Sequence, residues 1–322
     1  MKKLVLLIII ISSFSQLKAQ EGIPIYHDYL SDNLYLLHPS MAGAPYCAKV
    51  RMTGRMQWFG LEDAPMLQTL SFNTHLGQNS RTGIGGIIFN DRNGYHSQKG
   101  IQLAFAYHLD FSNGGDFNKL SFGISGTYVQ NQLDETSFDP NRFDPIIAGI
   151  VQSENYFNLD FGFSYHVENF FLNMSVKNAL LMDRQLYTAY EPQNVRNFVG
   201  SIGYFFGKND FHVEPSFLVQ YKDYNGQLIV DQNLKFYFDV SQLNQVYFGA
   251  SYRRDFSDSP YEAYHNITPI IGARIGKYVL AYTYTYELGN RPVANSGFHQ
   301  LTLGYNFNCT HPIGRNKCPE LN

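Results

Sequence analysis

The stretch KVRMTGRMQW, residues 49–58, decides the fold because its side chains alternate between two characters. Apolar or small side chains stand at Val50, Met52, Gly54, Met56 and Trp58, with Lys49, Arg51, Thr53, Arg55 and Gln57 between them. Successive side chains of a β-strand point to opposite faces, so this period of two predicts a strand with one apolar and one polar face.

The same alternation recurs along the chain, at 101–109, 120–128, 157–166, 172–177, 278–287 and 301–307. Counting all such segments predicts about fourteen strands. We expect them to begin near residues 48, 66, 82, 98, 119, 156, 170, 197, 211, 227, 245, 265, 278 and 298.

The predicted connections fall into two classes. Those after even-numbered strands are mostly short, as at 168–169, 207–210 and 276–277, whereas those after odd-numbered strands are longer. The long ones include 131–155, 178–196, 255–264 and 288–297. Short turns on one rim and long loops on the other are typical of outer-membrane barrels, whose short turns face the periplasm. An even number of strands also places both ends of the barrel there.

Composition and the N-terminus agree with an exported membrane protein. Of the 322 residues, 16% are aromatic and only 16% are charged. Residues 1–19 have a basic start, an apolar stretch and Ala19 at the end, which predicts a cleavable secretory signal. Beyond it, no apolar run approaches the roughly 20 residues of a membrane-spanning helix, which excludes a helical transporter.

The charge balance excludes nucleic acid as a partner. Setting aside Lys2, Lys3 and Lys18 of the leader leaves 21 of the 24 basic residues against 27 acidic ones, a net charge of −6. A nucleic-acid-binding chain would carry a basic patch instead.

A soluble β-sandwich would also alternate, but its outer face meets water and should carry more charge. The leader and the aromatic excess favour an all-β, transmembrane, antiparallel β-barrel embedded in outer-membrane lipid. Its polar faces would then line the lumen, at Lys49, Arg51, Arg55, Asp160, Lys177, Glu214, Asp231, Lys235, Arg253 and Arg274. Tyrosines near strand ends would form interfacial girdles, namely Tyr156, Tyr165, Tyr204, Tyr221, Tyr252 and Tyr278.

Four regions follow from this interpretation. They are the signal peptide (1–19), an N-terminal plug or periplasmic cap (20–47), the barrel (48–308) and a periplasmic tail (309–322). Barrels of about eight strands are filled by their own side chains, and those of sixteen or more hold an aqueous channel. Fourteen strands lie between these limits, so we expect a further segment in the lumen. The stretch before the first strand is the candidate.

The three cysteines are too few to build the fold. Cys309 and Cys318 would pair as a local clasp in an oxidising compartment, and the alternative is three isolated thiols that include Cys47. Spacings typical of metal ligands, phosphate loops, dinucleotide fingerprints and nucleophile elbows are missing from the sequence. We therefore expect no cofactor, no metal and no catalytic residue.

Several short stretches together resemble one known family. They are Arg55 to Gly60 with Ala64-Pro65 and Gln68-Thr69, His38 to Gly43, Gly83 to Gly85 with Asn90-Asp91, Glu214 to Ser216, Tyr252-Arg253, Ser296 to His299 and Cys318-Pro319. The sequence resembles the PorP/SprF family of Bacteroidetes outer-membrane proteins. The motif residues, for which we expect structural roles, are Arg55, Gln57, Trp58, Gly60, Pro65, Asp91, Pro215, Arg253 and His299.

The resemblance implies a non-enzymatic barrel of the type IX secretion system and its gliding-motility branch. Members support the export or surface attachment of adhesin-like proteins that carry a C-terminal sorting domain, and some act with periplasmic rings of the machine. The first hypothesis is capture of such a substrate, mainly by 131–155 and 178–196. The alternatives are a structural link to the periplasmic ring, a diffusion channel and, last, an enzyme.

Overall fold

The computed structural model describes most of the chain from Asn33 to Cys309. The described ranges are 33–45, 47–57, 64–77, 81–112, 117–136, 149–180, 196–208, 210–223, 226–241, 243–256, 265–288 and 297–309. The predicted leader, the residues after 309 and the centres of several long loops lie outside these ranges.

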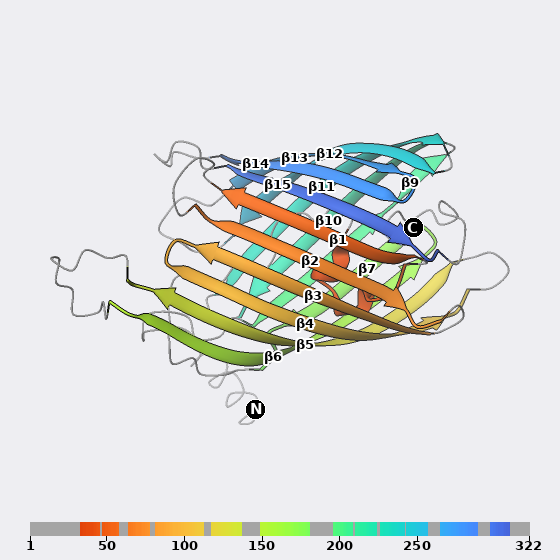
Figure 1. Cartoon of the computed structure of the whole chain (residues 1–322). Coiled ribbons are helices and arrows are strands. Elements are labelled where there is room, and N and C mark those ends of the chain that lie inside the picture. Colours follow the sequence, from red (N-terminus) through yellow and green to blue (C-terminus); the bar gives the residue numbers. More distant parts are fainter. Residues whose placement is uncertain are drawn as a thin grey trace, which may run out of the picture.

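The described residues form one antiparallel sheet that closes on itself (Figure 1). Its strands are β1 (Ala48–Gln57), β2 (Met66–His75), β3 (Thr82–Asn93), β4 (His96–Asp110), β5 (Asn118–Asp134), β6 (Val151–Val167), β7 (Phe170–Lys177), β8 (Asn197–Tyr204), β9 (Phe206–Lys208), β10 (Phe211–Lys222), β11 (Gln227–Ser241), β12 (Asn244–Asp255), β13 (His265–Ile275), β14 (Tyr278–Leu288) and β15 (Phe298–Phe307). Successive strands pair, except that β8 and β9 both pair with β10, and β15 pairs with β1 from Phe307 opposite Ala48 to Phe298 opposite Gln57.

Two of these elements are parts of one strand. Both β8 and β9 pair with β10 in a single register, which places Phe205, between them, opposite Glu214 and places Tyr204 opposite Pro215. Proline has no amide hydrogen to donate to a ladder, which accounts for the interruption. The described residues therefore form a closed barrel of fourteen strands, and the predicted fold class is confirmed.

The two faces of the wall differ as predicted. Large apolar side chains are exposed on the outside, where lipid surrounds a membrane barrel, as at Leu103 (64% exposed) and Met52 (57%). Of the charged residues expected in the lumen, Arg55 is half-buried and the others are buried. Tyr156 does not belong to a girdle, which corrects the prediction. It shares the inward face of β6 with Asn158 and Asp160, and its hydroxyl accepts a hydrogen bond from Gln98 Nε2 (2.8 Å).

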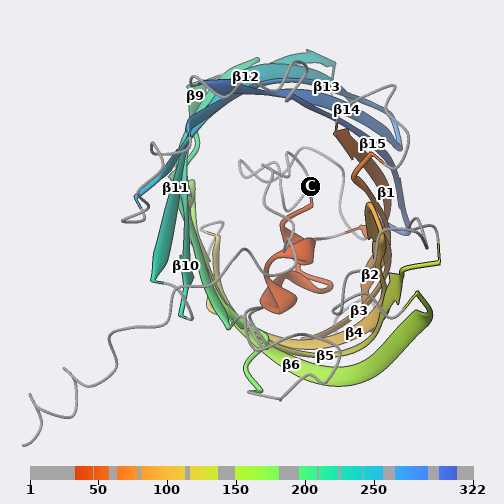
Figure 2. The ribbon, with the colours of Figure 1, turned by 90° about the vertical axis from the view of Figure 1, so that its left-hand side faces the viewer.

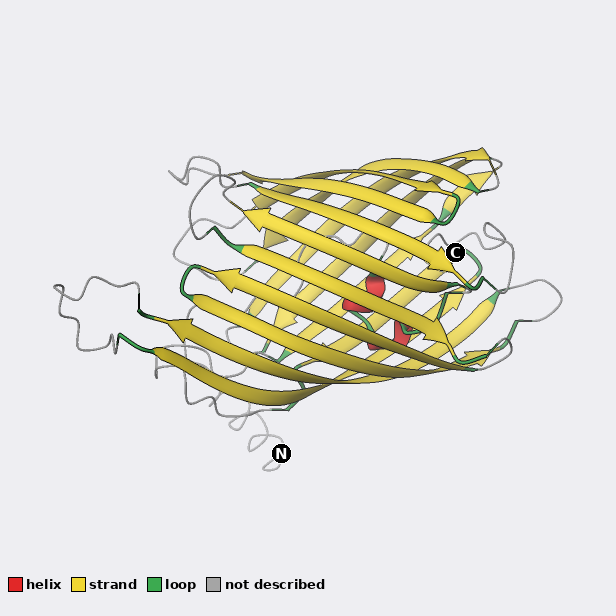
Figure 3. Cartoon of the chain, in the orientation of Figure 1, coloured by secondary structure: helices red, strands yellow, loops and turns green. Residues whose placement is uncertain are grey.

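The strands, not helices, form the wall (Figure 3). Two single-turn 3-10 helices, η1 (Leu34–Leu36) and η2 (Pro39–Met41), occur in the described ranges. No helix among the described residues has the length and apolar character needed to cross a membrane.

Both short helices lie inside the barrel, visible in the view along its axis (Figure 2). Lumen and periplasmic cap were the two expected positions for residues 20–47. Residues 33–45, which we call the inner segment, lie in the lumen, whereas residues 20–32 are outside the described ranges.

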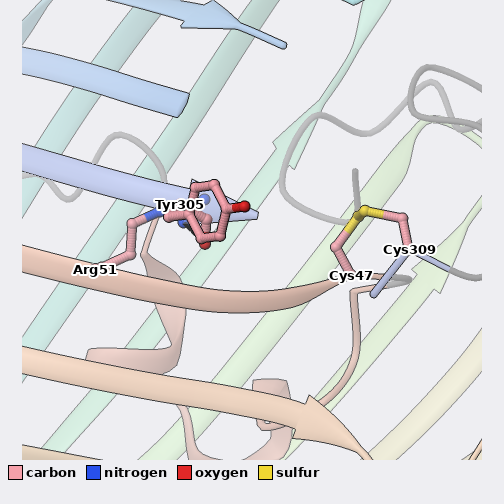
Figure 4. The surroundings of a disulfide bond; sticks show 4 residues. All are labelled: Cys47, Arg51, Tyr305 and Cys309. Atoms are coloured by element: carbon pink, nitrogen blue, oxygen red, sulfur yellow. Dashed lines mark hydrogen bonds between the residues drawn. A yellow bond between two sulfur atoms is a disulfide. The ribbon is translucent and has the colours of Figure 1, made fainter. Parts of the chain in front are cut away.

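The predicted pairing of Cys309 with Cys318 is wrong, because Cys309 forms a disulfide with Cys47 (Figure 4). The two cysteines are 262 positions apart, and their Cα atoms lie 4.0 Å from each other. Barrel closure explains the pairing: Cys47 precedes β1, Cys309 follows β15, and these strands are neighbours. The bond therefore fastens the seam of the barrel. Cys318 lies outside the described residues.

Candidate functional site

The inner segment is joined to the wall by hydrogen bonds from several strands. Asn33 Nδ2 donates to Ser71 Oγ on β2 (2.9 Å), and the hydroxyls of Ser40 and Ser164 are 2.6 Å apart. The Ala42 carbonyl oxygen lies 3.0 Å from His108 Nε2 on β4. Buried polar groups need such partners, so each contact satisfies the wall and the segment together. The segment is docked at several points.

His38 connects the segment to two further strands. Its Nδ1 lies 2.8 Å from Ser175 Oγ on β7, and its Nε2 lies 3.2 Å from Ser201 Oγ on β8. Burial, together with the nearby Lys177 ammonium, lowers the pKa of the His38 imidazole to about 3. The ring is therefore neutral at physiological pH, with one nitrogen donating and the other accepting.

Two lysines bind carbonyl oxygens of the segment. Lys119 Nζ on β5 donates to Ala44 O (3.2 Å), and Lys177 Nζ on β7 donates to Leu36 O (3.3 Å). Lys177 also forms an ion pair with Asp160 at 3.1 Å, with both side chains at most 8% exposed. The Lys177 ammonium, which donates a hydrogen bond to the segment, is thus also paired with a carboxylate of the wall.

Glycines of the wall make room for the segment. A Cβ atom added to Gly123 on β5 would lie 2.3 Å from the Ser40 amide nitrogen, and one added to Gly83 on β3 would lie 2.0 Å from Ala42 O. At Gly162 on β6 it would lie 2.9 Å from the Pro39 ring. We call these three residues the glycine cradle. No other residue type permits so close an approach of the two backbones.

Apolar side chains complete the contact. Leu34, Leu36, Leu37 and Met41 of the segment are at most 7% exposed. They belong to one buried cluster with residues of the wall, namely Ile87, Ala104, Ala106, Phe171, Val199 and Leu218. Side chains pack against close neighbours in such a cluster as they do in a protein core. This part of the lumen is filled.

Strands β10, β11 and β12 carry charged networks on their lumenal face. Lys235 Nζ lies 3.2 Å from Glu214 Oε2, which also accepts a hydrogen bond from the Tyr237 hydroxyl (2.6 Å). Arg253 donates two hydrogen bonds of 2.7 Å to the carboxylate of Asp231. These pairs join β10 to β11 and β11 to β12 across the lumenal face of the wall.

Lys235→Met should destabilise the barrel because it removes the ammonium that forms an ion pair with the buried Glu214 carboxylate. We expect a loss of about 3–5 kcal/mol for breaking a buried pair from one side. The midpoint of urea unfolding in detergent, followed by tryptophan fluorescence, measures the change. Lys235→Met combined with Glu214→Gln should recover most of the loss. Equal destabilisation in both variants would contradict the assignment of the effect to the buried negative charge of Glu214.

Outside the barrel, the apolar face ends along a row that crosses four strands. Ile88, Ile101, Tyr128 and Phe157 lie opposite one another on β3 to β6 and are 44–56% exposed. The next outward row toward the long loops is polar, with Asn90, Lys99, Gln130 and Asn155. Lipid contact therefore ends between these rows.

Beyond that boundary, β5 and β6 continue as a projecting hairpin (Figure 1). Each strand has 17 residues, and their pairing continues to Asp134 opposite Val151. At ~3.4 Å per residue, the hairpin extends about 20 Å along the strands past Tyr128. At its end, the Gly149 amide donates to Glu135 Oε2 (3.1 Å). The barrel thus presents a paired platform on its long-loop side.

Five motif residues gather where β1, β2, β3 and β15 meet the long loops. The Arg55 guanidinium lies 4.3 Å over the ring of Phe298, and Arg55 shares a lumenal row with Asp91 across β2. The Gln57 amide donates to Pro65 O (3.0 Å). His299, opposite Met56, faces outward, with its Nδ1 2.7 Å from the Tyr282 hydroxyl.

Two further motif residues that the structure describes lie elsewhere. Pro215 on β10 and Arg253 on β12 lie on the other side of the barrel, and Trp58 and Gly60 are outside the described residues. The motif residues that the structure describes therefore do not form one site. Sequence reasoning did not identify the residues that dock the inner segment, although His38 to Gly43 is one of the family-like stretches. Glycines at lumenal positions of the alternating pattern were the available signal.

The described residues include no group of three or more His, Cys, Asp or Glu side chains that could hold a metal ion. The contacts described above are packing, hydrogen bonds and ion pairs. This arrangement is suited to fixing a segment in a barrel and to presenting a surface outside it.

Comparison with known families agrees with this architecture. The family model described as "Type IX secretion system membrane protein PorP/SprF" matches residues 18–305. The chain belongs to the PorP/SprF family. This membership, which extends over nearly the whole chain, confirms the resemblance found in the sequence. As a PorP/SprF protein with a closed barrel, it is a type IX secretion membrane protein of the outer membrane.

Other comparisons are less informative about this PorP/SprF barrel. No curated protein matches its sequence. The solved structures to which it is similar include the Pseudomonas putida toluene transporter TodX, at 10% identity and a TM-score of 0.45, covering 91% of this chain and 100% of that one. They also include the β domain of the Bordetella autotransporter BrkA, at 14% identity and a TM-score of 0.41, covering 81% and 98%, and the KdgM porin, at 7% and 0.37, covering 80% and 99%. At these values the matches carry no argument about function.

Proposed function

We propose that this barrel holds a secreted type IX substrate at the cell surface by binding the C-terminal sorting domain of that substrate. The binding surface is the long-loop rim, centred on the projecting β5–β6 hairpin. The role is one of attachment, without chemical conversion. The observation that carries the proposal is that the wall continues as paired strands beyond the end of its lipid-facing surface.

The occupied lumen supports attachment over conduction. The inner segment is bonded to β2, β4, β5, β6, β7 and β8, and its central residues from Leu36 to Met41 are all buried. A diffusion channel needs a continuous aqueous path, which this docking opposes. The substrate therefore binds at the rim and not in the lumen.

The projecting hairpin has the composition of a recognition surface. Its outer face past the apolar row offers Gln130, Gln132, Ser153 and Asn155, with Tyr128 and Phe157 directly below. Adaptable polar groups beside aromatic rings give contact area and hydrogen bonds at modest entropy cost. The predicted contact loops, 131–155 and 178–196, begin at this surface, although their central parts lie outside the described residues.

Shortening the hairpin tests the proposal. Removing 130–133 together with 152–155 deletes four paired positions and keeps the inward and outward alternation of both strands. We expect loss of most surface-bound substrate while the barrel remains folded, because the substrate's platform is removed. Surface substrate is measured by antibody labelling of intact cells, and folding by the shift of the unheated barrel in gel electrophoresis.

Truncation after Cys309 is the matched control. It removes the tail expected in the periplasm and leaves the rim unchanged, so surface substrate should stay near the wild-type level. The reverse result, with secretion lost on truncation and normal in the shortened hairpin, would contradict attachment at the rim. It would move the function to a link with the periplasmic ring.

A further inference from the structure

Strand β6 has a long partner on one side and a short one on the other. It has 17 residues and pairs with β5 along its whole length. Its pairing with β7, which has 8 residues, covers only Phe161–Val167. Beyond this, the Ala179 amide donates to Leu159 O (2.8 Å), and the Asn178 amide donates to Asp160 Oδ1 (2.9 Å). The outer half of β6 therefore extends past its neighbour.

The direction of these bonds shows which backbone groups face that side. Leu159 and Phe161 present their peptide groups to β7, so alternation assigns Val151, Ser153, Asn155 and Phe157 to the same edge. On the other edge, Ile150 O accepts from the Glu135 amide. Within the described ranges, no backbone group pairs with the edge from 151 to 157.

The sequence of this edge lacks the residues that usually block strand pairing. Natural edge strands are blocked by proline, lysine, bulges or covering elements. The sequence from 151 to 157, VQSENYF, contains no proline, glycine or lysine, and Glu154, its one charged residue, lies on the lumenal face with Tyr156. Because Val151, Ser153 and Asn155 lie past the apolar row that ends at Phe157, this part of the edge is outside the lipid.

We propose that this edge binds an extended strand of the exported partner, which adds to the barrel wall beside β6. The inference rests on the proposed function and specifies its mode of recognition. Backbone hydrogen bonds supply the binding, and alternate side chains supply the selectivity. The added strand carries apolar side chains beside Phe157 and Val151 and polar or small ones beside Asn155 and Ser153.

Ser153→Pro tests the backbone bonds directly. The Ser153 amide points to the open edge, so proline removes an edge donor without removing a β5–β6 ladder bond. Ser153→Ala is the matched control, because it keeps the amide and loses only the hydroxyl. If proline disturbs folding, Asn155→Lys places a blocking charge on the edge, with Asn155→Gln as its control.

The readout is photo-crosslinking in the native bacterium. A benzophenone amino acid replaces Phe157 or Val151 in the full chain, and crosslinked peptides are identified by mass spectrometry. Supporting results are crosslinks from both positions to one short stretch of a secreted protein's C-terminal domain. The yield should fall roughly fivefold with Ser153→Pro and stay near wild type with Ser153→Ala.

Four results would overturn the inference. Crosslinks to residues 181–195 of the same chain would show that the protein closes its own edge, and crosslinked dimers would show a second copy there. If surface substrate is lost when the hairpin is shortened but is unchanged by Ser153→Pro, attachment at the rim stands and strand addition fails. If wild-type cells hold no substrate through this barrel, the proposed function fails as well.

Discussion

Deleting residues 33–45 should turn a silent barrel into a conducting one. The inner segment supplies the core packing and the hydrogen bonds that fill one side of the lumen, and a barrel of fourteen strands without it is wide enough to hold water. We expect no steady current from the wild-type protein in planar bilayers and discrete open-channel steps from the deletion. Single-channel recording at fixed voltage measures the difference.

The wild-type protein is the control for this deletion, and the gel shift of the unheated barrel shows whether both forms are folded. A wild-type barrel that already conducts would contradict the view that the segment obstructs the lumen. A folded deletion that stays silent would assign the obstruction to the charged networks around Glu214 and Asp231.

Gly123→Leu should expel the inner segment without removing it. The new Cβ would lie 2.3 Å from the Ser40 amide nitrogen and 2.4 Å from the Pro39 carbonyl carbon, and backbone atoms cannot rotate away as a flexible side chain can. Overpacking of this kind costs about 1–3 kcal/mol or more. We expect open-channel steps like those of the deletion and rapid hydrogen exchange at the amides of 36–44.

Gly86→Leu is the matched control for this substitution. It makes the same change on the outward face of the wall, where the nearest atom to an added Cβ is Leu103 Cδ2 at 3.7 Å. Leucine is a common residue on a lipid-facing surface, so this variant should not conduct. The amides of 36–44 should remain protected from hydrogen exchange. Equal effects of Gly123→Leu and Gly86→Leu would show that any glycine substitution in a strand has this effect. They would contradict a specific role of the glycine cradle in holding the inner segment.

The wall was predictable from local pattern. Side-chain alternation within single strands fixed most strand starts, including those of β1, β2, β3, β7, β8 and β10. The clearest difference is β6, which begins at Val151 and was expected near 156. The apolar alternation ends at Phe157 because the strand leaves lipid there, so its polar outer part carries no periodic signal.

Features that depend on closure were harder to derive. The disulfide joins residues 262 positions apart, and only the β1–β15 seam brings them together, so nearness in sequence favoured the wrong partner for Cys309. The docking of His38 likewise depends on Ser175 and Ser201, which lie on two different strands. Tyr156 lies near the predicted start of its strand, which suggested a place in the girdle. The alternation of side chains along β6 nevertheless already placed Tyr156 on the inward face.

The bond between Cys47 and Cys309 makes the polypeptide between them a covalent ring. The inner segment belongs to the chain just before that ring, and it lies in the opening that the ring surrounds. The molecule is thus a lasso, with its tail held inside its own loop. While the bond is intact, parting the strands at the seam cannot release this tail sideways. It can leave only along the barrel axis.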